Sequence, residues 1–153
     1  MIESFAVARA MREHEWLYPA VAIAHIVGFS ILFGSVVMFD LRVLGLSKSI
    51  SVRALARLLL PWSVASLLLI VPTGLLLFAA HADDFLESRA FAIKMALLLA
   101  AGLNAAMFLT GPYQTAKSWD TGMKAPLVAR LSVALSIVLW IGVISCGRII
   151  ARP

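Results

Sequence analysis

Residues 16–39 read WLYPAVAIAHIVGFSILFGSVVMF and contain no Lys, Arg, Asp or Glu. A transmembrane helix needs roughly 20 consecutive apolar residues, so this stretch is long enough to cross a bilayer. One ionisable side chain, His25, lies within it. An ionisable residue at membrane depth is by default a hypothesis about function. The stretch therefore predicts a membrane span and marks a first candidate site.

The composition of the whole chain indicates the same environment. Of its 153 residues 62% are hydrophobic and only 14% are charged, whereas charged residues make up about a quarter of a soluble domain. Three further apolar runs follow the first, and the short loops leave no room for a separate soluble domain. We therefore expect an all-α fold, an integral membrane four-helix bundle. It forms one domain over residues 1–153, with spans at about 17–39, 61–81, 90–110 and 131–149.

Two shorter helices are expected beside the spans. Residues 1–16 lack the apolar core and cleavage site of a secretory signal peptide, and their apolar residues share one helical face, which favours a short amphipathic helix on the membrane surface. Residues 47–60 predict an interfacial lead-in helix with Ser51 as its N-cap, after which Pro61 opens the second span. Pro72 should kink that span.

Each predicted span carries one face of small residues. Such faces mark helix contacts in membranes, because small side chains allow two backbones to approach closely. This pattern predicts that all four helices pack together. The small residues include Gly28 and Ser35, Ser63 and Gly74, Ala101 and Ala105, and Ser132 and Ser136.

The loop charges predict an orientation. Four spans place both termini on one side, and the loops at 40–60 and 111–130 on the other. These two loops carry seven Lys and Arg residues against six on the side of the termini. Because cytoplasmic loops carry the excess of Lys and Arg, we expect both termini outside the cytoplasm of a bacterial inner membrane. The net charge of +5 sits at helix ends, so the expected partner is the lipid bilayer and not nucleic acid.

His25 admits three interpretations. At 1.5 Å per residue it lies ~12 Å below the outer surface, a depth shared with Thr73, Gly74 and Trp140. In a structural role, a neutral imidazole donates to the Thr73 hydroxyl or to a carbonyl that Pro72 frees. In a cofactor role, His25 binds haem b or copper. In a transport role, it belongs to a path for protons or a solute.

A cofactor site around His25 requires further residues at its own depth. His81 lies about 10 Å higher by the same rise per residue, which disfavours a bis-histidine haem. Met95 comes closer, and thioether and imidazole groups bind both haem iron and copper. The candidate cofactor-binding set is therefore His25, Met95, Thr73 and Trp140.

The outer edge offers a second candidate, for a divalent metal ion. Imidazole and carboxylate ligands suit zinc or copper, although charged residues also gather at a membrane edge simply because they meet water. The residues concerned are His14, His81, Asp83 and Asp84.

Four other polar residues are expected to have structural roles. We expect Lys94 to extend toward the outer headgroups, and Asn104 to join two helices by hydrogen bonds. Asp40 and Arg42 close the first span, where we expect a local ion-pair anchor with Arg53 or Arg57.

A resemblance to a known family rests on a set of short motifs. They are WLYP at 16–19, HIVG at 25–28, DLRVLG at 40–45, and Lys94 with Asn104. In this combination the chain resembles an uncharacterised family of small bacterial four-span membrane proteins. The resemblance implies a four-helix membrane fold and lends weight to His25, Asp40, Arg42, Lys94 and Asn104. A looser likeness to the membrane part of copper-resistance proteins supports copper.

The sequence leaves three functions open. The first is a small membrane module with a buried polar site around His25, acting as a cofactor-binding redox or accessory subunit. The second is a pathway for a metal ion, protons or a small solute, which would require a homo-oligomer because four spans enclose little space. The third is a structural subunit of a larger membrane complex. No nucleotide-binding loop, HExxH, CxxC or catalytic-triad motif favours an enzyme.

Overall fold

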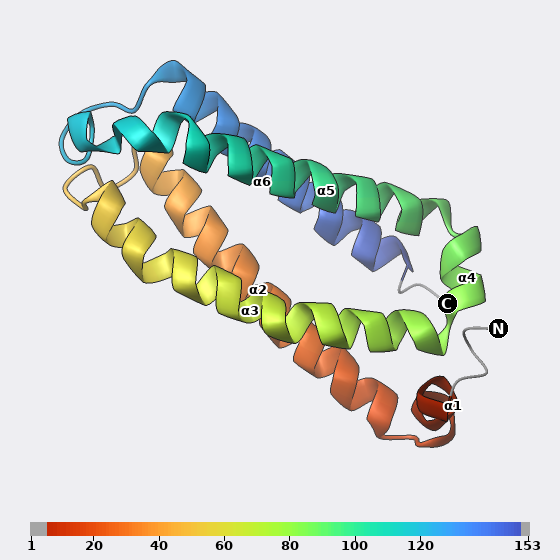
Figure 1. Ribbon diagram of the computed structural model, residues 1–153. Coiled ribbons are helices and arrows are strands. Elements are labelled where there is room, and N and C mark those ends of the chain that lie inside the picture. The colour runs from red at the N-terminus through yellow and green to blue at the C-terminus, as the bar shows by residue number, and fades with distance from the viewer. Residues whose placement is uncertain (1–5, 151–153) are drawn as a thin grey trace.

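The computed structural model describes residues 6–150, without the side chains of residues 6–8 and 12, and within this range it contains helices and no strand (Figure 1). The all-α prediction is confirmed. The helices in chain order are α1 (Ala6–Glu13), α2 (Leu17–Leu44), α3 (Val52–Ala80), α4 (Ala82–Glu87), α5 (Arg89–Thr110), the 3₁₀ helix η2 (Pro112–Ser118) and α6 (Leu127–Ile150).

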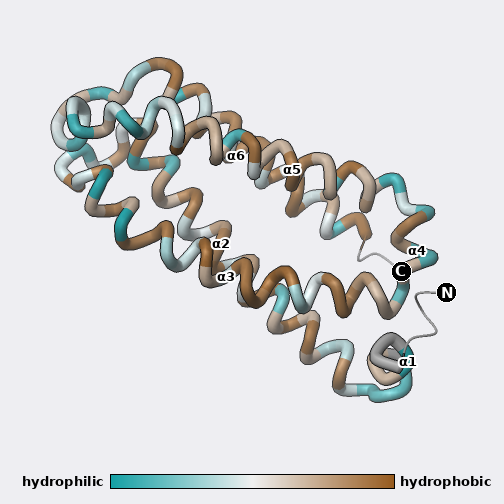
Figure 2. The backbone as a smooth tube through the Cα atoms, in the orientation of Figure 1, coloured by the Kyte–Doolittle hydropathy of each residue, from teal (hydrophilic) through white to brown (hydrophobic). Residues whose placement is uncertain are grey.

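Four helices are long and apolar enough to cross a membrane, namely α2, α3, α5 and α6. The shortest, α5, has 22 residues and is therefore about 33 Å long, slightly more than the hydrocarbon core of a bilayer. Hydrophobic residues cover the length of these helices, and hydrophilic residues gather at their ends (Figure 2). Many large apolar side chains face outward, such as Leu68, which is 78% exposed. This outward apolar surface suits lipid and confirms the four-span membrane fold.

The expected lead-in helix is continuous with the second span. The helix α3 begins at Val52, where the Ser51 hydroxyl accepts a hydrogen bond from the Ala54 N–H at 3.0 Å, as predicted. It then runs through both Pro61 and Pro72 to Ala80. A proline costs a helix one hydrogen bond and does not by itself end it. Because the cap starts the helix well before Pro61, that proline lies inside the helix and does not open it.

The four spans form two antiparallel pairs. One pair is α2 with α3, the other is α5 with α6, and α2 packs against α6 to join them. Glycines mark the close approaches. A Cβ built on Gly28 of α2 would lie 3.0 Å from Ile70 of α3, and one built on Gly142 of α6 would lie 3.0 Å from Leu97 of α5. Along their described lengths α3 and α5 share no extended contact, so the expectation that all four helices pack together is met only in part.

The apolar core lies at one end of the bundle, beside the α2–α3 and α5–α6 loops. There the two pairs converge, and toward the other end they diverge (Figure 1). Buried residues from both pairs and from the α5–α6 loop form this core, including Phe39, Val43, Val52, Phe108, Trp119 and Val133. The molecule is therefore closed at the loop end and more open at the end of the termini.

Arg42 and Asp120 hold the loop end together. The buried Arg42 guanidinium donates to the carbonyls of Ile50, Lys48 and Asp120, the last two at 3.1 and 2.9 Å. The Asp120 carboxylate accepts from the Arg53 N–H at 2.8 Å and from the Ser51 hydroxyl at 2.9 Å. The predicted ion-pair anchor, in which Asp40 and Arg42 interact with Arg53 or Arg57, is wrong. The Arg42 guanidinium donates its hydrogen bonds to loop carbonyls instead.

Candidate functional site

A cavity of about 440 Å³ lies between the two helix pairs, with α2, α3, α5 and α6 all contributing to its walls. Some lining residues of α3 are more than half exposed, such as Val64 and Val71. Gly102 and Ala105 of α5 also line the cavity and are exposed. The cavity therefore opens on the outer surface between α3 and α5, the two spans without extended mutual contact. In a bilayer this opening faces lipid.

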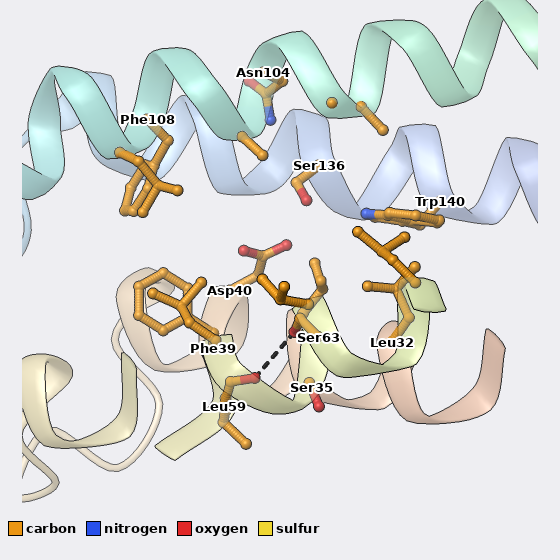
Figure 3. Close-up of a pocket in the computed structure, with 18 of the residues that line it drawn as sticks. Leu32, Ser35, Phe39, Asp40, Leu59, Ser63, Asn104, Phe108, Ser136 and Trp140 are labelled. Carbon is orange, nitrogen blue, oxygen red and sulfur yellow. Dashed lines mark hydrogen bonds between the residues drawn. The ribbon is translucent and has the colours of Figure 1, made fainter. Parts of the chain in front are cut away.

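Aromatic rings form both ends of the cavity (Figure 3). Phe39 and Phe108 meet edge-to-face at the end nearer the loops, with ring centroids 5.7 Å apart. Phe29 and Trp140 meet at the other end, 5.8 Å apart. Aliphatic side chains cover most of the wall between them. The cavity thus offers an apolar and aromatic surface, which is typical of a site for small molecules.

One carboxyl group stands out in this apolar surface. Asp40 is only 4% exposed, and its Oδ2 atom accepts no hydrogen bond from the residues that the structure describes. It lies two helical turns beyond Leu32 on α2, on the face that lines the cavity. Its carboxyl projects into the cavity toward Ser136 of α6 (Figure 3). A buried charge without a partner is costly, so this group is the strongest functional signal in the site.

Three other polar residues around the cavity, Asn104, Ser132 and Ser63, form hydrogen bonds within the protein. Asn104 donates to the Ser132 carbonyl at 3.0 Å, and the Ser132 hydroxyl donates to the Asn104 side-chain oxygen at 2.9 Å. This reciprocal pair joins α5 to α6, as expected for Asn104. The Ser63 hydroxyl donates to the Leu59 carbonyl at 3.1 Å. Asp40 therefore differs from these three residues, because its Oδ2 atom has no partner among the described residues.

His25 packs against α3, outside the set of residues that line the cavity. Its Nδ1 lies 3.0 Å from the Thr73 hydroxyl and 3.1 Å from the Ile70 carbonyl. The Thr73 hydroxyl itself donates to the Leu69 carbonyl at 2.6 Å, so Nδ1 is the donor in both of its contacts. A Cβ built on Gly74 would lie 3.1 Å from His25 Cε1. These are the contacts expected of a histidine in the structural role.

The other expected ligands of a cofactor are not gathered around His25. Trp140 lines the cavity, whereas Met95 is 49% exposed and does not. Its helix, α5, shares no extended contact with α2 along the described residues. The Lys94 side chain is half-buried on α5. Its ammonium nitrogen lies near Gly147 of α6, 3.9 Å from the position that a Cβ built on this glycine would occupy. The two interior candidates, His25 and the cavity, are therefore separate sites.

The predicted metal ligands of the outer edge do not form a cluster in the described part of the chain. Within residues 6–150 no group of three or more His, Cys, Asp and Glu side chains is arranged to hold a metal ion. His81 packs edge-to-face on Tyr18, with ring centroids 5.3 Å apart. His14 and Asp84 are exposed, as is Asp83. The structure thus leaves the four predicted ligands His14, His81, Asp83 and Asp84 ungrouped.

The sequence contained a signal for the cavity in its small residues. Ser35, Ser63 and Ser136 belong to the small-residue faces that we interpret as helix contacts, and all three line the cavity instead. On a span that packs only partly, a small residue leaves space where a large one would fill it. Asp40 lies on the same face of α2 as Leu32 and Ser35. An acidic residue on a face of small residues could have indicated the cavity from the sequence.

Comparison with known proteins gives a family and no activity. A family model described as a family of unknown function (DUF6644) matches residues 15–152. No curated protein and no solved structure matches the chain. The match covers all four spans, the cavity and His25. The chain therefore belongs to this family of unknown function, DUF6644.

Proposed function

We propose that this protein is a small membrane module that binds a lipid-soluble molecule in the cavity between its helix pairs. The observation that carries the proposal is the cavity itself: about 440 Å³, lined mostly by apolar side chains, and bordered by exposed residues of α3 and α5. Ligand pockets have volumes of about 300–1,000 Å³ and combine an apolar wall with a few polar groups. A molecule dissolved in the bilayer can reach this cavity without crossing water.

The proposed site is centred on Asp40 rather than on His25. The imidazole Nδ1 of His25 is already used by Thr73 and Ile70, whereas Asp40 Oδ2 has no partner among the described residues. A binding role as an accessory subunit fits a chain without catalytic motifs. Trp140 is the one member of the expected cofactor set that contributes directly to the cavity.

We further propose that the protein lies in a bacterial inner membrane with both termini outside the cytoplasm. The support is the seven Lys and Arg residues near the α2–α3 and α5–α6 loops, against six on the side of the termini. The opening between α3 and α5 then lies within the bilayer.

Filling the cavity tests the proposal. The Gly102→Leu substitution places a large side chain on the cavity wall of α5, where a built Cβ has no atom within 4 Å, so folding should be preserved. Gly34→Leu is the matched control, because Gly34 of α2 is also free of neighbours within 4 Å and does not line the cavity. The probe is 1-adamantanol, a compact apolar molecule.

Calorimetric titration in phosphatidylcholine nanodiscs, with empty nanodiscs as the blank, measures binding of the probe. We expect saturable binding to the wild type and to Gly34→Leu. We expect about tenfold weaker binding to Gly102→Leu, since an extra side chain in an occupied site costs about 1–3 kcal/mol. Equal affinity in all three proteins, or no saturable binding to the wild type, would contradict the proposal.

A further inference from the structure

The hydrogen-bond inventory of the cavity indicates what kind of ligand it accepts. The hydroxyl hydrogens of Ser63 and Ser132 are used on Leu59 and Asn104, and the Asn104 amide donates to Ser132. The buried Asp40 Oδ2 is an acceptor without a donor in the described part of the chain. Ser136 hydrogen-bonds the Asp40 carboxyl, yet the Oδ2 atom still lacks a donor, which the N–H of a ligand would supply.

The charges around the cavity are also unbalanced. Asp40 is an acid, and none of the residues that line the cavity is Lys, Arg or His. The nearest basic residue along α2, Arg42, uses its guanidinium on the carbonyls of Ile50, Lys48 and Asp120. A carboxylate without a cationic partner inside a membrane is costly. A positively charged ligand would supply the missing partner.

The shape and lining of the cavity select an organic cation. Inorganic cations such as Ca²⁺ need six to eight oxygen ligands, whereas this wall is mostly apolar. Phe39 lies next to Asp40 in sequence and pairs with Phe108 at one end of the cavity. Aromatic faces attract cations, more strongly where water is excluded. The site thus combines one acid with aromatic rings and an apolar wall.

We propose that the ligand is a lipophilic amine bound as its ammonium ion. Its N–H donates to Asp40 Oδ2, and its apolar body fills the space between the two aromatic pairs, Phe39 with Phe108 and Phe29 with Trp140. This inference rests on the proposed binding function and adds the chemical class of the ligand. Asp40 is the residue that distinguishes an ammonium ion from a neutral molecule of the same shape.

Two probes of one shape test this selectivity. These are 1-adamantanamine, which is an ammonium ion at pH 7, and 1-adamantanol, which is neutral. Both are titrated by calorimetry into wild type, Asp40→Asn and Asp84→Asn in phosphatidylcholine nanodiscs. Asparagine keeps the shape of Asp40 and removes its charge. Asp84→Asn is the control, since Asp84 is an exposed acid at the outer end.

In the wild type and in Asp84→Asn we expect the amine to bind about tenfold more tightly than the alcohol, as hydrogen bonds to charged groups contribute about 1.5–3 kcal/mol. In Asp40→Asn the amine should lose its advantage, so that the two probes bind with similar affinity. Circular dichroism in nanodiscs shows that the variant is folded.

The outcomes separate the two proposals. If both probes bind the wild type equally, or Asp40→Asn keeps the preference for the amine, the ammonium inference is wrong and the binding function stands. If neither probe binds the wild type, the binding function itself fails. Should Asp40→Asn fail to fold, the comparison of the two probes on the wild type still decides the inference.

Discussion

Asp40 and His25 lie on the same membrane span, and their surroundings differ sharply. The imidazole of His25 donates to Thr73 and Ile70 on the neighbouring helix. The carboxyl of Asp40 reaches a cavity, where one of its oxygens has no partner among the described residues. A satisfied buried polar group stabilises a fold, while an unsatisfied one costs free energy and needs an explanation. His25 therefore has the contacts expected of a structural residue, and Asp40 those expected of a binding residue.

The contact of His25 with Gly74 leads to a prediction on stability. We expect Gly74→Ala to destabilise the protein by about 1–2 kcal/mol, because the new Cβ would lie 3.1 Å from the imidazole and force a shift. The same change at Gly34, which has no neighbour within 4 Å, should be neutral or stabilise α2 by up to about 1 kcal/mol. Unfolding by SDS in mixed micelles, followed by circular dichroism, measures both effects.

A double-mutant cycle identifies the cause. In a His25→Ala background the imidazole is gone, so Gly74→Ala should lose most of its cost. If Gly74→Ala is equally destabilising with and without the imidazole, the close contact between α2 and α3 at this point is not the source of the effect.

At the scale of the elements, a small polar cluster joins the two loops at the closed end. The Asp120 carboxylate accepts from the Arg53 backbone N–H and from the Ser51 hydroxyl. The Arg53 N–H, then the Ser51 hydroxyl and the charges of Arg53 and Arg42, hold the pKa of Asp120 below its ordinary value. Ser51 also caps α3. The start of α3 is thus tied to the loop before α6.

The lowered pKa of Asp120 predicts a dependence of stability on pH. Since the folded state prefers the carboxylate, its stabilising effect is fully present above the unfolded-state pKa of about 3.9 and is lost as pH falls through the lower, folded-state pKa. We expect Asp120→Asn to lower stability at pH 7 by about 1 kcal/mol, and to lose less stability than wild type between pH 7 and pH 3. Thermal unfolding in detergent at the two pH values measures this.

The exposed Glu15, near the start of α2, provides the control for this experiment. Glu15→Gln should retain the wild-type loss of stability between pH 7 and pH 3. If Asp120→Asn shows the same pH dependence as wild type, the loop carboxylate does not contribute to acid stability as the geometry indicates.

At the scale of the whole molecule, the two helix pairs converge at the loop end and diverge toward the termini (Figure 1). Apolar packing is concentrated at the closed end, in the core around Phe39, Val43, Val52 and Phe108. The cavity begins at this core and extends along the space that α3 and α5 leave between them. The arrangement places Asp40 between a well-packed end and a more open part, through which the proposed ligand would enter.

The proposed orientation predicts the activity of enzyme fusions, because alkaline phosphatase is active only outside the cytoplasm. A fusion after Pro153 should be active, and a fusion after Gly122, in the loop between α5 and α6, should be inactive at similar expression. The physical reason is the small excess of Lys and Arg in the loops on the second side. The reverse pattern of activities would overturn the proposed orientation.

The four spans and the Ser51 cap were predictable because they depend on local patterns: uninterrupted apolar length and a capping side chain at a helix start. Matching residues by depth also placed Thr73 and Gly74 beside His25, since depth follows from the constant rise of a helix. The surroundings of Asp40 were not predictable. Its charged neighbours in sequence suggested an ion pair, while Arg42 finds a partner in Asp120, 78 residues away.

The amino-acid pattern alone indicates a membrane protein and the segments that can cross the bilayer, because each span satisfies its own backbone and needs only apolar length. The packing of the helices, which the pattern does not reveal, pairs α2 with α3 and α6, keeps α3 and α5 apart, and places Asp40 in the resulting cavity. The physical reason is that lipid solvates apolar helix faces about as well as another helix does. Helix pairing in a membrane therefore depends on the fit of small residues and polar groups across the whole bundle.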